Sequence, residues 1–164
     1  PMVNSSEELQ ELLNDVKYPP LGKRSFGINR AQGYGKDFDD YVSSWNKSSI
    51  FIAQIESKSA VDSIEKIVSN PDLDGIMIGP YDLSGSLGVP GQKFHPLVKE
   101  AESRVIKACK ERGISCGTQL SDFNKGSVQA ALDMGYTFII ASSDLFVLEA
   151  WASGAEKVMQ GLRL

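Results

Sequence analysis

The sequence has few of the residues that build disulfide or zinc scaffolds, since its 164 residues include two cysteines and one histidine. Cys109 and Cys116 are seven positions apart, one in an expected helix and the other in an expected strand. This spacing suits neither a pair of metal ligands nor a disulfide framework. We therefore expect two buried free thiols.

The sequence also lacks a surplus of basic residues and any long apolar run. Its net charge is −4, so no excess of positive charge is available to neutralise the phosphates of a nucleic acid. No apolar run approaches the roughly 20 residues that a membrane-spanning helix needs, and the first residues show no signal-peptide pattern. We expect a cytoplasmic protein that binds neither nucleic acid nor membranes.

What the sequence does contain is an alternation of short apolar runs and amphipathic helices. Four runs predict buried strands, and a possible fifth strand ends at residues 1–3; the four lie at residues 50–55, 75–78, 115–119 and 137–141. Residues 19–49 predict a long loop with a short helix near 37–45. The other helices are expected between Ser5 and Pro19 and at residues 59–69, 96–112, 124–134 and 145–159.

Strands that alternate with helices predict a parallel α/β sheet with right-handed crossovers. A closed (β/α)₈ barrel takes about 250 residues, so residues 1–164 are expected to be a single domain that forms only part of such a barrel, without its first strands. The initial Pro1 suggests that the sequence starts partway through a longer protein. An open, doubly wound sheet is the alternative fold.

Polar residues follow two of the expected strands, where ligands bind in parallel α/β folds. Gln54 and Glu56 end the first clear strand, and Asp82 lies just past the next one. Two carboxylates at one rim repel each other unless a cation lies between them, and their oxygens suit Mg²⁺ or Mn²⁺. Each acid alone also has an ordinary explanation, as a helix cap or a solvated residue.

The segment from Gly79 to Asp82 is stronger evidence for a ligand site than either acid alone. Gly79 permits close backbone approach, and the N–H groups of the following peptides can point at an anion. We therefore expect a substrate that carries a carboxylate.

Several segments together resemble the HpcH/HpaI aldolase family. They are Gln54-Ile55-Glu56, then Asp74-Gly75-Ile76-Met77-Ile78-Gly79-Pro80-Tyr81-Asp82-Leu83-Ser84, Leu87-Gly88 and His95-Pro96, preceded by Pro1-Met2-Val3 and by residues 18–24. The resemblance covers nearly the whole chain. It implies a TIM barrel of the PEP/pyruvate-binding type and a metal-dependent aldolase, which cleaves 2-keto-3-deoxy sugar acids or 4-hydroxy-2-oxo acids to pyruvate and an aldehyde.

The resemblance also implies residue roles. Glu56 and Asp82 would hold the divalent metal, Gln54 would lie beside the oxo group of the substrate, and the backbone of Gly79, Tyr81 and Asp82 would hold the pyruvate carboxylate. The cation would stabilise the charge that develops on the oxo oxygen as an enolate forms.

The sequence departs from the family pattern because no residue corresponds to the catalytic Arg and His, which members carry upstream of the segment resembling Pro1-Met2-Val3. We expect His95 to cap a helix and Arg24 to anchor a loop or lie on the surface. No catalytic residue is therefore assigned. The chain is expected to be a fragment of an active enzyme or a catalytically incomplete relative that binds metal and keto acid.

Two other enzyme classes and an assembly remain open. An acyl-CoA lyase of the citrate-lyase type would need basic groups for the CoA phosphates, and a Schiff-base aldolase would need a desolvated lysine, for which Lys58 is the candidate. The last helix has an apolar surface that either covers the barrel or packs against another subunit, formed by Leu145, Leu148, Trp151, Ala152 and Ala155. The resemblance suggests that subunits of a homo-oligomer exchange this region. The acceptor aldehyde and the choice between Mg²⁺ and Mn²⁺ are not determined by the sequence.

Overall fold

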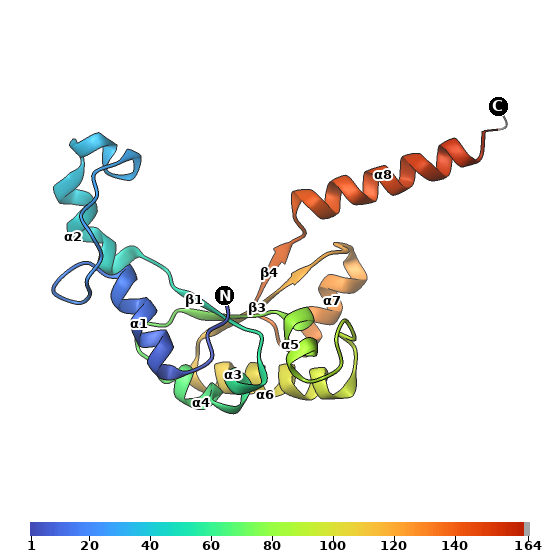
Figure 1. Cartoon of the computed structure of the whole chain (residues 1–164), viewed down its shortest axis with the longest axis horizontal. Helices are drawn as coiled ribbons and strands as arrows, with labels where there is room; N and C mark the ends of the chain where they lie inside the picture. The colour runs from blue at the N-terminus through green and yellow to red at the C-terminus, as the bar shows by residue number, and fades with distance from the viewer. Residues whose placement is uncertain (163–164) are drawn as a thin grey trace.

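A parallel four-stranded sheet forms the centre of the computed structural model, which describes residues 1–162 (Figure 1). The strands are paired in chain order, and all three pairings are parallel. They are β1 (Ile52–Ile55), β2 (Gly75–Ile78), β3 (Ser115–Leu120) and β4 (Phe138–Ala141). The predicted α/β class and its four parallel strands are confirmed.

Helices connect the strands and cover mainly one face of the sheet (Figure 1). Helices α1, α3, α4 and α6 lie beneath the sheet, whereas α8 projects away from the body. The helical elements are α1 (Ser6–Val16), the 3₁₀ helix η1 (Arg30–Gly35), α2 (Phe38–Ser48), α3 (Lys58–Asp62), α4 (Ile64–Ile67), α5 (Pro80–Ser86), α6 (Pro96–Arg112), α7 (Lys125–Met134) and α8 (Asp144–Gln160). No helix in the described part of the chain is long and apolar enough to cross a membrane.

The two faces of the sheet differ in burial. Ile55, Ile76 and Ile78 are fully buried and belong to the main hydrophobic core, together with the inward residues of α6. On the opposite face Ile52 is 45% exposed and Ile140 is 38% exposed. Because successive strand residues point to opposite faces, the helices seal one side and leave the other side open.

The helix caps predicted from the sequence are confirmed at the starts of α1 and α6. The Ser5 side chain accepts a hydrogen bond from the Glu8 N–H at 3.1 Å, and His95 Nδ1 accepts one from the Leu97 N–H at 3.2 Å. Gly113 ends α6 with a φ of 71°, a left-handed conformation that favours glycine. His95 is thus a helix cap, as expected.

The single helix expected at residues 59–69 is wrong, because α3 and α4 replace it. The Ser63 N–H is shared between the carbonyls of Ser59 and Ala60, which tightens the chain at Ser63 and starts a new turn. Ile64 and Ile67 are both fully buried after this break. The apolar stripe of the expected helix is therefore kept, but it is divided between two shorter helices.

Two other expectations need adjustment. Residues 1–3 form no strand, although the Val3 N–H donates to the Gln54 carbonyl at 3.2 Å and so lies beside β1. The loop at 19–49 contains η1 as well as a helix, α2, that extends to Ser48. The segment after β2, for which no element was predicted, is the helix α5, and Pro80 at its start is preset for a helical φ. Cys109 and Cys116 are free and buried, as predicted.

The stability of the hydrophobic core should depend on the buried side chains of β2. We expect Ile76→Ala to lower the free energy of unfolding by about 2–5 kcal/mol, because it leaves a cavity where the side chain was fully buried. Leu97→Ala, at a side chain that is 45% exposed, should cost under about 1 kcal/mol. Urea denaturation followed by circular dichroism measures both, and equal losses would contradict this assignment of the core.

Candidate active site

A cavity of about 160 Å³ lies at the carboxyl ends of the strands. Gln54 reaches it from β1, Gln119 and Ser121 from the end of β3, and Gly79 through Asp82 from the junction of β2 with α5. Neighbouring parallel strands end at the same rim, so residues distant in the sequence converge there. Of the sequence-predicted site residues, Gln54, Gly79, Tyr81 and Asp82 all line this one cavity.

Glu56 lies directly behind the cavity wall and does not line it. It is 4% exposed. Its Oε2 accepts a hydrogen bond from Gln54 Nε2 at 2.8 Å, and its Oε1 accepts one from the Met2 N–H at 2.7 Å. The carboxylate is therefore held by two neutral donors, one from its own strand and one from the start of the chain.

Gly79 makes the close packing around Glu56 possible. A Cβ atom at residue 79 would lie 2.5 Å from Glu56 Oε2, which is too short for a real contact, and 3.0 Å from Gln54 Nε2, which is unusually tight. The Gly79 N–H donates to the Ile55 carbonyl at 3.1 Å. This bond extends the pairing of β1 and β2 by one residue and sets Gly79 against Glu56.

Asp82 and Tyr81 occupy the first turn of α5, where backbone N–H groups have no intrahelical partner. Both side chains are exposed. The Lys93 ammonium lies 5.1 Å from the centre of the Tyr81 ring. The backbone of Gly79 was expected to help hold the substrate carboxylate, but its N–H already donates to the Ile55 carbonyl. The N–H groups of Tyr81 and Asp82 are therefore the ones available to an anion.

The two carboxylates of the predicted metal site have no cationic partner. Among residues 1–162, neither Glu56 nor Asp82 forms an ion pair with a Lys, Arg or His side chain. A buried carboxylate without a positive partner is costly, and a hard divalent cation would offset that cost. No group of three potential acidic, histidine or cysteine ligands occurs in the same residues, so most of an octahedral shell would come from water and substrate.

Four residues of the cavity wall lie outside the motifs identified in the sequence: Lys93, Gln119, Ser121 and Phe146. Gln119 and Ser121 were detectable, since they are polar residues at a strand end like Gln54. Lys93, in the connection between α5 and α6, and Phe146, at the start of α8, carry no local signal. Only the tertiary fold brings them to the rim.

Two residues left aside as catalytic candidates have structural roles. The Arg24 guanidinium lies 4.0 Å from the centre of the Trp45 ring and 5.0 Å from that of Tyr18, which confirms that it anchors a loop. Lys58 is exposed and pairs with Asp62. A Schiff-base lysine needs the opposite, a desolvated ammonium.

Comparisons with known proteins agree with the motifs. The family model described as HpcH/HpaI aldolase/citrate lyase matches residues 1–149. A hydroxypyruvate/pyruvate aldolase of Roseobacter denitrificans is 35% identical over 98% of this chain and 63% of its own length. A 2-keto-3-deoxy-L-rhamnonate aldolase of Salmonella typhimurium is 34% identical over 88% of this chain and 54% of its own length.

Solved structures show the same fold. An HpcH/HpaI aldolase/citrate lyase family protein from Burkholderia cenocepacia is 29% identical, with a TM-score of 0.87 over 97% of this chain and 63% of that one. An HpcH/HpaI aldolase from Desulfitobacterium hafniense is 28% identical, with a TM-score of 0.84 over 98% and 62%. The chain thus spans between about half and two thirds of the length of these relatives.

The order of strands, the motifs at the rim and these matches lead to one assignment. The parallel sheet is part of a TIM-barrel-type fold, and the chain belongs to the HpcH/HpaI aldolase/citrate lyase family.

Proposed function

We propose that the protein is a metal-dependent aldolase, a carbon–carbon lyase that cleaves a 2-keto-3-deoxy sugar acid or 4-hydroxy-2-oxo acid to pyruvate and an aldehyde. The observation that carries the proposal is the buried Glu56 carboxylate, which has only neutral hydrogen-bond partners and lies against Gly79 behind the cavity that Asp82 lines. The names of the two aldolase relatives support the same reaction class.

Each residue then has a separate task. Glu56 and Asp82 hold Mg²⁺ or Mn²⁺, and when bound the cation supplies positive charge that stabilises the developing charge on the 2-oxo oxygen of the substrate. Gln54 lies beside that oxo group. Gly79 leaves room for the Glu56 carboxylate, and the N–H groups of Tyr81 and Asp82 bind the carboxylate of the substrate. These tasks are binding and orientation, and proton transfer is assigned to none of these residues.

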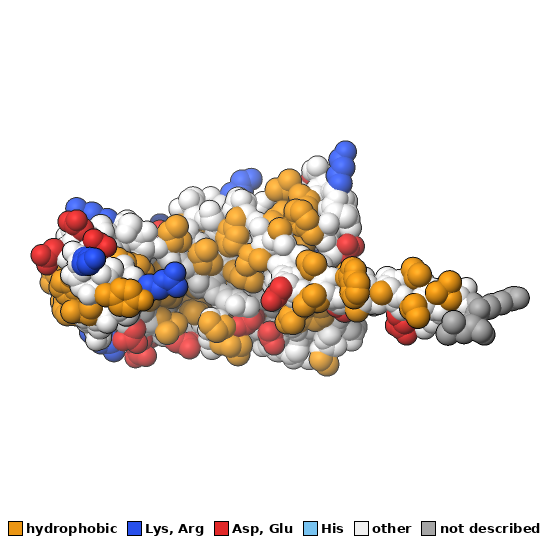
Figure 2. Space-filling model, turned by 90° about the horizontal axis from the view of Figure 1, so that it is seen from above, with side chains coloured by type: hydrophobic (Ala, Val, Ile, Leu, Met, Phe, Trp, Pro, Cys, Tyr) orange, Lys and Arg blue, Asp and Glu red, His pale blue; other side chains and the backbone are white. Residues whose placement is uncertain are grey.

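We further propose a homo-oligomer, with α8 packed against another copy. Among the described residues, none in α8 is buried, and Trp151 is 74% exposed and Leu148 63% exposed. Figure 2 shows hydrophobic side chains along the helix where it extends from the body. A surface of this kind is normally covered by a partner. We also propose that residues 1–164 form one domain, the C-terminal part of the barrel, and that the protein is cytoplasmic.

The ligand assignment is tested with the complete gene product. Glu56→Gln and Asp82→Asn should each weaken Mn²⁺ binding by at least about 100-fold, because a neutral amide replaces an anionic ligand. Free Mn²⁺ is measured by electron paramagnetic resonance, and pyruvate release from a 4-hydroxy-2-oxo acid by a coupled lactate dehydrogenase assay.

Glu65→Gln and Asp62→Asn are the matched controls, since both acids lie on the surface in ion pairs with Arg104. They should bind Mn²⁺ as the unaltered protein does. Tight Mn²⁺ binding by either site variant would refute the ligand assignment. Activity that survives chelation, together with capture of pyruvate by borohydride, would replace the metal mechanism with a Schiff base.

The close approach at residue 79 has its own test. Gly79→Ala should lower the free energy of unfolding by about 1–3 kcal/mol, since the new Cβ displaces Glu56, and should weaken Mn²⁺ binding about tenfold. Gly85→Ala, within α5 and facing open space, should be neutral or stabilising by up to about 1 kcal/mol. Urea melts and Mn²⁺ titrations distinguish the two, and a harmless Gly79→Ala would show that the packing is not required.

The oligomer is tested at α8. Trp151→Glu should yield a smaller assembly in size-exclusion chromatography with light scattering, because a charge cannot be buried in an apolar interface without a partner. Lys157→Glu changes charge at an exposed position of the same helix and should leave the mass unchanged. An unaltered mass for Trp151→Glu would place the interface elsewhere.

A further inference from the structure

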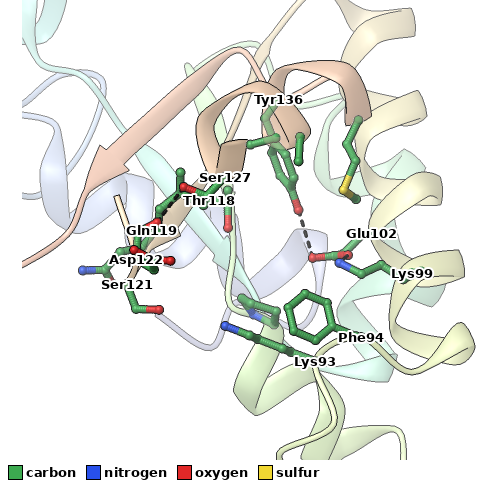
Figure 3. Close-up of a pocket in the computed structure, with 15 residues that line it drawn as sticks. Lys93, Phe94, Lys99, Glu102, Thr118, Gln119, Ser121, Asp122, Ser127 and Tyr136 are labelled. Carbon is green, nitrogen blue, oxygen red and sulfur yellow. Dashed lines mark hydrogen bonds and ion pairs between the residues drawn. The ribbon is translucent and has the colours of Figure 1, made fainter. Parts of the chain in front are cut away.

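A second cavity, of about 320 Å³, lies between α6, α7 and the end of β3 (Figure 3). It has twice the volume of the cavity that holds the proposed keto-acid site, which measures about 160 Å³. It is formed on the helix-covered side of the sheet. Thr118, which pairs with the buried Ile78 and points to that side, lines this cavity, whereas Met77, which points to the open side, lines only the other cavity. None of the roles proposed above uses it.

The floor of this cavity is a buried polar network. Glu102 is 3% exposed, although α6 otherwise turns apolar residues inward. Tyr136 Oη donates to its Oε1 at 3.1 Å, and Lys99 Nζ donates to its Oε2 at 2.7 Å. Thr118, at 6% exposed, lines the same cavity. In Figure 3 the Tyr136 hydroxyl and the Glu102 carboxylate face each other beside the open space.

This network keeps capacity for a ligand. Each carboxylate oxygen can accept a second hydrogen bond beyond the one it already receives. Burial and the neighbouring Glu102 carboxylate raise the pKa of Tyr136, so its hydroxyl stays protonated. Burying these polar and charged groups carries a desolvation penalty, which an apolar side chain at the same position would avoid. Its position in a cavity favours recognition of hydroxyl groups over simple packing.

The rest of the wall is mainly apolar. Leu120, Ala131, Met134 and Phe94 supply it. A cavity with an apolar wall and a polar floor suits a carbon chain that carries hydroxyl groups, since its C–H surface packs against the wall while the hydroxyls reach the floor.

The two cavities meet at one rim. Pro80, Lys93, Gln119 and Ser121 line both. Pro80 directly follows Gly79 and precedes the two N–H groups assigned to the substrate carboxylate. A linear substrate bound at that end therefore has the second cavity beside it. The Lys93 ammonium lies 5.1 Å and 5.2 Å from the Tyr81 and Phe94 ring centres, at the junction.

We propose that the α6–α7 cavity binds the hydroxylated, aldehyde-derived half of the substrate, with Glu102 and Thr118 as the residues that select hydroxyl groups. This inference rests on the proposed function and narrows it, because it selects sugar-like 2-oxo acids over substrates whose aldehyde half is a plain alkyl chain. Glu102 accepts hydrogen bonds from the hydroxyls, and Thr118 can donate or accept. A site built to hydrogen-bond a hydroxyl discriminates strongly against an analogue without it.

Binding is tested first, on the complete gene product, with probes that cannot be cleaved. D-Gluconate carries hydroxyl groups along a six-carbon acid, and hexanoate is the same chain without them. Isothermal titration calorimetry should show gluconate bound at least about tenfold more tightly than hexanoate. Glu102→Gln and Thr118→Val, which nearly preserve side-chain shape, should each weaken gluconate about five- to tenfold and leave hexanoate unchanged.

Glu111→Gln, on the exposed side of α6 in a surface pair with Lys107, is the control and should change neither affinity. If Glu102→Gln does not fold, the gluconate and hexanoate affinities of Thr118→Val still test the inference. Equal affinities of the unaltered protein for the two probes, or site variants that keep full gluconate affinity, would overturn the inference. A purely structural role of Glu102 would weaken both probes equally and would also overturn it.

Aldol addition of pyruvate to D-glyceraldehyde and to propanal then separates the two proposals. The site variants should lower kcat/KM for glyceraldehyde about tenfold relative to propanal. Loss for both aldehydes alike would overturn the inference while leaving the aldolase proposal intact. No addition to either aldehyde by the unaltered protein, with gluconate binding as expected, would support the hydroxyl-binding cavity and refute the aldolase function.

Discussion

The site depends on the close approach of β1 and β2 at the point where both strands end. One backbone hydrogen bond, from the Gly79 N–H to the Ile55 carbonyl, continues their pairing beyond the last regular residue and sets Glu56 against residue 79. The approach is possible because residue 79 has no side chain. Glu56 can then be buried with Gln54 as its partner, and the chain turns directly into α5, which presents Asp82 and two free N–H groups. Each element of the proposed keto-acid site follows from this contact.

The two sides of the sheet have different tasks. The helix-covered side contains the core that makes the strands rigid, with Ile55, Ile76 and Ile78 buried in it. The rim contains the polar groups of the proposed keto-acid site, whereas the open side carries exposed apolar residues such as Ile52 and Ile140. At the end of β3 this division is not complete, because Thr118 and Glu102 place hydrogen-bonding groups on the covered side. The two cavities share part of their walls, and in the proposed function this would let one substrate be recognised by its acid end and by its hydroxylated end in separate places.

Much of the architecture was predictable from local pattern. Apolar runs and capping residues located the four strands and most helices, since burial on both faces requires near-continuous apolar residues and helix ends require donors and acceptors. The break at Ser63 and the helical state of residues 80–86 were not predicted, because they depend on how the helices fit against the sheet. The polar residues that end β1 and follow β2 identified Gln54, Gly79, Tyr81 and Asp82 as neighbours of one cavity. The same rule applied to β3 would have added Gln119 and Ser121.

The sequence by itself determined the class of fold, the family and the residue types at the strand ends, because periodicity and motif order are properties of the chain. The tertiary structure decided the rest. It placed Glu56 behind the cavity wall, with the Met2 N–H on one oxygen, and it brought Lys93 and Phe146 to the rim from distant segments. It also assembled Glu102, Tyr136 and Thr118 into one network. Contacts between residues far apart in the sequence depend on how helices pack on the sheet, and no local pattern records that packing.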